Sequence, residues 1–304
     1  MQDFTDFSAS PIGIAGAGRV AQALGRLLYT HGEPVAFIAS RSREHGSSAA
    51  AFIGPNVEAV SYCDLAQYAR RILIAVPDSA LEATAALLDL RSGIVLHTCG
   101  AQGPEGLDTL AQRGVFCGTL HPLQTISDPE SGAAALMGAA FAISGDAPAL
   151  AWAERIASAA NGRILRIPSE RRPLYHAAAV MASNYIITLM SAAQTLLIAA
   201  DVDPEEALLA LGPLARTSLD NALRQGPTAA LTGPIERGDV STIGDHLTAL
   251  EDHLTALEDI PGPIPLLYRA AGLQTLELAR KRGLSAERAA ATERLLEASL
   301  CQVR

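Results

Sequence analysis

Short apolar runs alternate with longer alanine- and leucine-rich segments along the first half of the chain. The runs have the length of buried strands, and the segments between them have the spacing of helices. This alternation predicts a mostly parallel sheet with helices on both faces. We expect strands at residues 12–16, 35–39, 58–61, 71–76, 93–97, 115–119, 140–144 and 163–167.

The strand pattern stops at residue 168, and the rest of the chain is predicted to be entirely helical. Glycine and proline pairs divide this part into segments. We expect helices at residues 170–200, 204–224, 238–258, 263–282 and 285–300, with breaks at Gly212-Pro213, Gly226-Pro227, Gly233-Pro234 and Pro261-Gly262-Pro263.

A glycine-rich turn joins the first predicted strand to the first predicted helix. Its sequence, Gly16-Ala-Gly-Arg-Val-Ala21, has the G-x-G-x-x-A spacing that binds a dinucleotide pyrophosphate at a helix N-terminus. Gly16 would permit the tight turn, Gly18 would let the phosphates approach the backbone, and Ala21 would pack the helix on the strand. Arg19 and Val20 lie in the same turn. The alternative is an ordinary strand, turn and helix.

Pattern and motif together predict an α/β fold in two parts. A Rossmann domain with a mostly parallel, doubly wound sheet is expected over residues 1–168, and an all-α domain over residues 169–304.

The end of the second predicted strand indicates which dinucleotide binds. NAD-specific sites carry an acidic residue there, but this chain has Ser40, Arg41 and Arg43. Hydroxyl and guanidinium groups suit a 2′-phosphate, so NADPH/NADP is the expected cofactor. The alternative is that both arginines are ordinary solvated charges.

Two further strand ends are expected to line the same crevice, because ligands bind at the carboxyl ends of the strands in such sheets. The fourth predicted strand ends in Val76, Pro77 and Asp78. The fifth is followed by Thr98 and Gly100.

Composition excludes several classes of protein. The net charge is −9 and only 18% of the 304 residues are charged, which argues against a nucleic-acid or anionic-membrane partner. The polar segment Met1–Ser10 does not read as a secretion signal, and no run was expected to reach the roughly 18 apolar residues that span a bilayer. A cytoplasmic protein is expected. Four dispersed cysteines indicate neither a disulfide framework nor a zinc site.

One heptapeptide is repeated in the helical half, because residues 245–251 and 252–258 share the sequence DHLTALE. The repeat predicts a leucine stripe that packs against a core or a partner. His246 and His253 come with it, but two histidines seven residues apart without a third ligand nearby do not indicate a metal site.

Several motifs together resemble a known family of bacterial proteins, in which a Rossmann-like domain is joined to the helical DUF2520 domain. The likeness is more distant to pyrroline-5-carboxylate reductases, classical ketopantoate reductases and the 6-phosphogluconate dehydrogenase-like group. It implies NADPH-dependent hydride transfer to a small carboxylate-bearing C=O or C=N. It rests on Gly16–Ala21, Ala75–Asp78, His97–Gly100, His121–Thr125, His176–Asn184 and Leu231–Asp239.

The resemblance also implies roles for two residues of the first long helix. His176 stands where classical ketopantoate reductases have a proton-donating Lys, and Asn184 stands where they have a substrate-binding Asn. A histidine could protonate an alkoxide or only orient the substrate, and both roles stay open. Along one helix, His176 and Asn184 would share a face. The alternative is a buried core histidine and an asparagine that bonds between helices.

Other candidate contacts lie in turns. His121 and Gln124 follow the sixth predicted strand, with Pro122 holding the chain extended just beyond the sheet. Arg237 could clamp a substrate carboxylate and Thr242 could donate a hydroxyl, whereas Asp239 suits a helix cap. Cys99 is interpreted as a small, half-buried residue, since no acyl-transfer group accompanies it.

The sequence therefore predicts an NADPH-dependent reductase of a small 2-oxo acid, with ketopantoate as the leading candidate. An imine reductase of the pyrroline-5-carboxylate type is the alternative of the same class. A non-catalytic NADP-binding regulatory protein is the alternative of another class. A homodimer through the long apolar helices is also expected.

Overall fold

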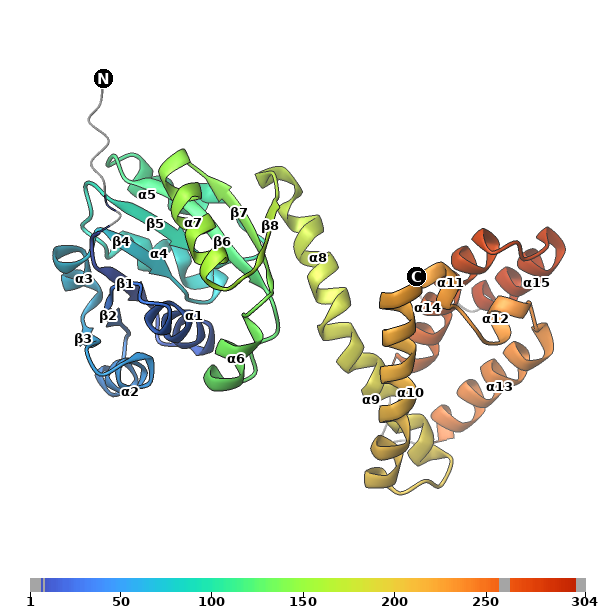
Figure 1. The fold of residues 1–304 in the computed structure, drawn as a ribbon. Helices are drawn as coiled ribbons and strands as arrows, with labels where there is room; N and C mark the ends of the chain where they lie inside the picture. Colours follow the sequence, from blue (N-terminus) through green and yellow to red (C-terminus); the bar gives the residue numbers. More distant parts are fainter. Residues whose placement is uncertain (1–6, 8, 257–262, 299–304) are drawn as a thin grey trace. The chain divides into compact units, whose positions relative to one another are not determined.

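The computed structural model describes residue 7, residues 9–256 and residues 263–298, apart from the side chains of residues 252–256. The chain divides into two compact units, Met1–Tyr185 and Ile186–Arg304 (Figure 1). From residue 169 on, the described residues form helices and no strand, as the sequence predicts. The first compact unit nevertheless extends to Tyr185, so it includes the beginning of this helical part.

An eight-stranded sheet forms the centre of the first unit, in the order β3-β2-β1-β4-β5-β6-β7-β8. Neighbouring strands are parallel except for β6 and β7, which are antiparallel. The strand order reverses at β1, which places the crevice for a ligand outside the carboxyl ends of β1 and β4. The strands are β1 (Ile12–Ala15), β2 (Val35–Ala39), β3 (Glu58–Val60), β4 (Arg71–Ile74), β5 (Ile94–His97), β6 (Phe116–Leu123), β7 (Ala140–Gly145) and β8 (Arg163–Arg166).

Helices cover both faces of this sheet, which confirms the predicted doubly wound fold (Figure 1). One apolar cluster packs α1, α2 and α7 against one face, and a second packs α3, α4 and α5 against the other. The helices of this unit are α1 (Arg19–Thr30), α2 (Arg43–Ile53), α3 (Tyr62–Tyr68), α4 (Leu81–Ala86), α5 (Asp108–Ala111), α6 (Pro129–Ala135), α7 (Ala147–Ala159) and α8 (Arg172–Ala182).

Strand β6 is longer than the sequence predicts, and it contains the position expected to lie in a loop. His121 pairs with Ala142 of β7, and Pro122 pairs with Phe141. On its other side β6 pairs with β5 only as far as Thr119, so beyond that residue one edge of the strand is open. A proline, which lacks an N–H donor, is tolerated at such an edge. His121 is therefore held by a strand and not by a turn.

Two predicted helix boundaries are wrong. The expected helix 170–200 is two helices, because Ser183 (φ −124°, ψ −73°) interrupts it. The expected break at Gly212-Pro213 is absent, because α10 continues through Pro213. α10 is largely exposed, so water can satisfy the carbonyl group that Pro213 leaves without a donor. The second unit contains α9 (Asn184–Ala199, which begins in the first unit), α10 (Pro204–Gln225), α11 (Pro227–Ala230), α12 (Pro234–Arg237), α13 (Val240–Ala256), α14 (Ile264–Lys281) and α15 (Ala286–Glu297).

The repeated heptapeptide lies mostly in α13. Leu247 and Leu250 of the first copy are buried, as the leucine stripe predicts. His246 is hydrogen-bonded through Nδ1 to the hydroxyl of Tyr268, 2.8 Å away. The side chains of the second copy, including His253, lie outside the described residues.

The stretch Ser169–Ala199 corrects another expectation. It is 31 residues long with a mean hydropathy of 1.3 over its most apolar part, so by length and composition it could cross a bilayer. Ser191 and Gln194 are polar but uncharged, and no charged residue stands between His176 and Ala199. Such an apolar stretch is equally suited to packing against another protein chain.

Candidate functional site

The turn between β1 and α1 fits a dinucleotide. Gly16 has φ +118°, and a Cβ there would stand 2.2 Å from the carbonyl oxygen of Ala75. Gly18 is the N-cap of α1 and supplies no capping side chain, so the first N–H groups of the helix have no cap. A Cβ at Gly18 would meet no atom within 4 Å. Open space in front of uncapped N–H groups is what a pyrophosphate requires.

The remaining residues of the turn hold α1 in place. Ala21 is fully buried against the sheet, and Val20 packs half-buried on the same core. The Arg19 guanidinium donates a hydrogen bond to the carbonyl oxygen of Ser127, at 3.0 Å. Arg19 thus ties the start of α1 to the loop before α6.

The segment after β2 presents two arginines at the carboxyl edge of the sheet. The Ser40 hydroxyl donates to the carbonyl oxygen of Ser42, and the Ser42 side chain caps α2. Arg41 and Arg43 are exposed and make no hydrogen bond or ion pair with any described residue. Their guanidinium groups are therefore available to an anionic ligand.

The end of β4 adjoins the glycine turn, and the end of β5 lies beside the end of β4. A Cβ at Gly16 would also lie 3.1 Å from Cγ1 of Val76. Pro77 and Asp78 are exposed, and Thr98 bonds through its N–H to the carbonyl oxygen of Ile74 at 3.0 Å. All of these residues lie beside the crevice.

Beyond β5, two histidines converge on Gly100. A Cβ on this buried glycine would lie 2.5 Å from Nδ1 of His176 and 2.8 Å from Nε2 of His121. The two rings meet edge to face, with centroids 6.0 Å apart. Nδ1 of His176 is buried and has no hydrogen-bond partner among the described residues. The structure thus brings together three residues that the sequence singled out separately.

Tyr175, which sequence reasoning missed, completes this cluster. Its hydroxyl is hydrogen-bonded to Nδ1 of His121 at 2.6 Å. Burial lowers the pKa of His121 to about 4 and raises the pKa of Tyr175 to about 12, so both groups are neutral at pH 7. We call Gly100, His121, Tyr175 and His176 the histidine cluster.

Arg172 fixes α8 to the sheet below the cluster. It is fully buried and donates to the hydroxyl of Thr119, to Oγ of Ser144 at 3.2 Å and to the carbonyl oxygen of Cys99 at 3.4 Å. Thr119 and Ser144 face each other across β6 and β7. Burial lowers the pKa of the guanidinium. No local pattern in the sequence could reveal this residue, because its partners are distant in the chain.

His97 holds the loop that carries Gly100. Its Nε2 donates to the carbonyl oxygen of Gly103 at 2.8 Å, and its Nδ1 accepts from the N–H of Cys99 at 3.2 Å. Burial lowers the pKa of His97 to about 4. Burial also raises the pKa of the Cys99 thiol to about 12. The residue is 2% exposed, so it is buried more completely than the sequence predicts.

Asn184 is exposed at the start of α9, and the helix break means that it does not share one continuous helical face with His176. The Gln124 amide accepts from the N–H of Thr125 and donates to the carbonyl oxygen of Ala135, so it ties the end of β6 to the C-terminus of α6.

The segment 232–239 is not a simple turn, because it contains the short helix α12, which ends at Arg237. The Arg237 side chain is exposed. It belongs to the second unit, so its role as a carboxylate clamp stays a prediction. Asp239 accepts from the N–H and the hydroxyl of Thr242, at 3.2 and 2.9 Å. The capping role of Asp239 is confirmed, and the Thr242 hydroxyl is engaged in it.

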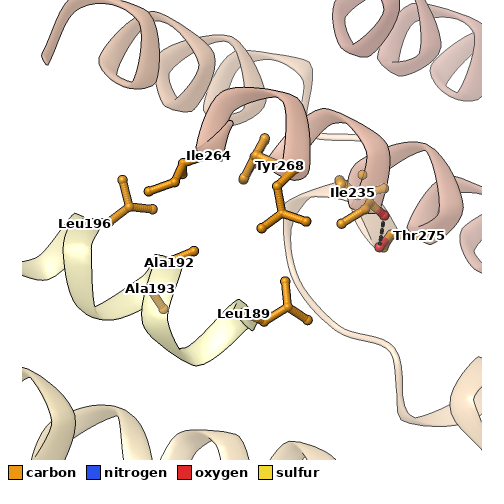
Figure 2. Close-up of a pocket in the computed structure, with 11 residues that line it drawn as sticks. Leu189, Ala192, Ala193, Leu196, Ile235, Ile264, Tyr268 and Thr275 are labelled. Carbon is orange, nitrogen blue, oxygen red and sulfur yellow. Dashed lines mark hydrogen bonds between the residues drawn. The ribbon is translucent and has the colours of Figure 1, made fainter. Parts of the chain in front are cut away.

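The second unit also contains an apolar cavity of about 260 Å³, between α9, α12 and α14 (Figure 2). Its titratable lining group, Tyr268, is already bonded to His246, and the Thr275 hydroxyl donates to the carbonyl oxygen of Ala271. A carboxylate would find no charged partner there. Among the described residues there is also no cluster of metal-binding side chains.

Comparisons with known proteins agree with the two-part architecture. Residues 6–122 match the Rossmann-like domain, and residues 139–262 match DUF2520, a domain of unknown function. No curated protein is significantly similar to the chain in sequence.

Solved structures share its fold. The putative NADP oxidoreductase BF3122 from Bacteroides fragilis is 24% identical, with a TM-score of 0.68 over 90% of this chain and 100% of that one. The protein TM1727 from Thermotoga maritima is 23% identical, with a TM-score of 0.66 over 89% and 99%. The 1-pyrroline-5-carboxylate reductase from Streptococcus pyogenes is 17% identical, with a TM-score of 0.57 over 95% and 97%. The chain thus joins a Rossmann-like domain to a DUF2520 domain, in a fold shared with pyrroline-5-carboxylate reductase.

Proposed function

We propose that this protein is an NADPH-dependent reductase of a small carboxylate-bearing 2-oxo acid, with ketopantoate as the leading substrate. The observation that carries the proposal is the convergence of His121 and His176 on Gly100, at the sheet edge that also carries the cofactor turn. Bound NADPH would supply a hydride. The histidine cluster would supply the hydrogen bonds that a developing alkoxide requires.

A C=O group suits this cluster better than a C=N group. The nitrogen of a reducible imine usually carries its own proton, whereas a ketone oxygen must receive one from the protein. At pH 7 the imidazole of His121 and the phenol of Tyr175 are neutral, and each keeps one hydrogen that it can donate. Reduction of a cyclic imine such as pyrroline-5-carboxylate is the alternative of the same class.

The exposed guanidinium of Arg41 favours NADP over NAD. Arg41→Ala is expected to weaken NADPH binding about tenfold or more and to leave NADH binding nearly unchanged, because only NADPH has the 2′-phosphate. Fluorescence titration with both nucleotides checks this. Arg91→Ala removes an arginine exposed elsewhere on the same unit and serves as the control. Equal losses for both nucleotides would contradict the assignment.

His176 and Asn184, which both belong to the first unit, are proposed to hold the substrate. His176→Ala is expected to reduce kcat/KM about 100-fold, and Asn184→Ala about tenfold, with NADPH affinity retained. Steady-state kinetics with ketopantoate, combined with NADPH titration, measure both effects. Unchanged turnover in both variants would remove these residues from the site. A wild-type protein that binds NADPH but reduces no substrate would favour the non-catalytic regulatory alternative.

The exposed apolar side chains of α8, α9 and α10 are proposed to be buried in a homodimer. α9 is described throughout, and none of its side chains is buried. α10 exposes leucines between charged residues such as Arg216 and Asp220. A second copy of the chain can supply charged partners for these side chains, whereas the interior of a bilayer cannot. The large exposed apolar residues here are Leu174, Met181, Tyr185, Ile186, Ile187, Leu189, Ile198, Leu208, Leu209, Leu214, Leu219 and Leu223.

Sedimentation at micromolar concentration tests this assembly. We expect a dimer for the wild type and dissociation for Leu209→Asp, with Leu87→Asp as a control at an exposed leucine of α4's C-terminus. A monomeric wild type would contradict the proposal. Flotation with phospholipid vesicles would instead assign the apolar stretch to a membrane.

A further inference from the structure

The hydrogen bond between Tyr175 and His121 determines which nitrogen of His121 faces the substrate. The Tyr175 hydroxyl lies 2.6 Å from Nδ1, and the two rings meet edge to face with centroids 5.5 Å apart. Nε2 is therefore the nitrogen that is left for a ligand. It is also the nitrogen that faces Gly100.

The surroundings of His121 favour one protonation state. His176, Arg172, His97 and Asp78 are the titratable or charged groups near it, and burial is the strongest influence. Burial lowers the pKa of His121 to about 4, so at neutral pH the ring carries a single proton. Burial also keeps Tyr175 protonated. A phenol that donates to Nδ1 leaves the imidazole proton on Nε2, directed toward Gly100.

We propose that Tyr175 and His121 form the proton relay of the reductase, and that His176 only orients the substrate. The inference rests on the proposed function. The hydride forms the new C–H bond at the carbonyl carbon while the C=O π bond breaks. The carbonyl oxygen takes the proton from Nε2 of His121, and Nδ1 takes the hydroxyl proton of Tyr175. Tyr175 is left as a phenolate. Nδ1 then returns the proton to Tyr175, and Nε2 of His121 takes a new proton from water, which restores the starting tautomer.

The charge of Arg172 partly offsets the effect of burial on the pKa of Tyr175. It precedes Tyr175 by three residues on α8, so both side chains lie on the same side of the helix. The guanidinium is fully buried and its hydrogen-bond partners are all neutral, so its charge is not cancelled by a carboxylate. That charge favours the phenolate form of Tyr175.

Tyr175→Phe tests the relay because it keeps the ring and removes only the hydroxyl. We expect kcat with ketopantoate to fall about 10- to 100-fold, with little change in KM or in NADPH affinity. Tyr29→Phe removes a hydroxyl near the C-terminus of α1 and serves as the matched control. His121→Asn should reduce kcat more than His176→Asn does.

Two further readouts separate a relay from a structural role. Because the donor is a neutral imidazole, kcat should not fall as pH rises through about 6.5, the ordinary pKa of histidine. Nitrogen-15 NMR of labelled histidine should show the Nε2-protonated form of His121 at pH 7, and Tyr175→Phe should mix the two tautomers.

Distinct results would overturn each claim. If Tyr175→Phe keeps the wild-type kcat, or if His121 carries its proton on Nδ1 in the wild type, the relay is wrong although the reductase stands. If His176→Asn loses more activity than His121→Asn, His176 is the donor. If none of the tested substrates supports NADPH oxidation by the wild type, the proposed function fails and the relay fails with it.

Discussion

Replacement of Gly100 with alanine is expected to lower kcat about 100-fold or more while NADPH still binds. The added methyl group would stand 2.5 Å from Nδ1 of His176 and 2.8 Å from Nε2 of His121, well inside contact distance. Both rings must move, and a displacement of about 1 Å at reacting groups can cost 100-fold in rate. Cofactor contacts at the glycine turn are unaffected.

Steady-state kinetics with ketopantoate and fluorescence titration with NADPH measure the two effects of Gly100→Ala. Gly244→Ala is the matched control, because a Cβ at Gly244 would meet no atom within 4 Å. A Gly100→Ala enzyme with wild-type kcat would show that the histidine cluster takes no part in the reaction.

Alanine at the two glycines of the cofactor turn is expected to have opposite effects. Gly16→Ala should lower the free energy of unfolding by about 3 kcal/mol, because φ is +118° and the methyl would collide with the Ala75 carbonyl. Gly18→Ala should change stability by only about 0.5 kcal/mol, because φ is −74° and the space is open. The same methyl would occupy the space of the pyrophosphate, so Gly18→Ala should weaken NADPH binding about tenfold.

Denaturant unfolding without nucleotide and NADPH titration distinguish the two variants. A stable Gly16→Ala protein would show that the backbone of this turn is free to adjust. A Gly18→Ala protein with wild-type NADPH affinity would mean that the cofactor does not lie over this turn.

The sequence predicts the sheet well because its signals are local. Each buried strand is an apolar run bounded by turn residues, and Gly16 to Ala21 form a turn whose spacing is itself the motif. The length of β6 could not be predicted, because residues 120–123 form a strand only through antiparallel pairing with β7. The helix break at Ser183 could not be predicted either, because no proline or glycine stands near it.

The candidate site was predicted only in part, for the same reason. His121 and His176 stand out as histidines in a plausible context, but only the folded chain brings them together at Gly100. Tyr175 and Arg172 have no sequence signal, because their partners on β6 and β7 are distant in the chain. Interactions of this kind depend on tertiary packing and not on spacing.

The most direct test of the proposed function measures NADPH oxidation by the purified full chain through the absorbance of NADPH. The candidate substrates are ketopantoate, other small 2-oxo acids and pyrroline-5-carboxylate. We expect turnover with 2-oxo acids, fastest with ketopantoate, and its loss in His121→Asn at unchanged NADPH affinity. Tight NADPH binding without turnover of any substrate would contradict this expectation.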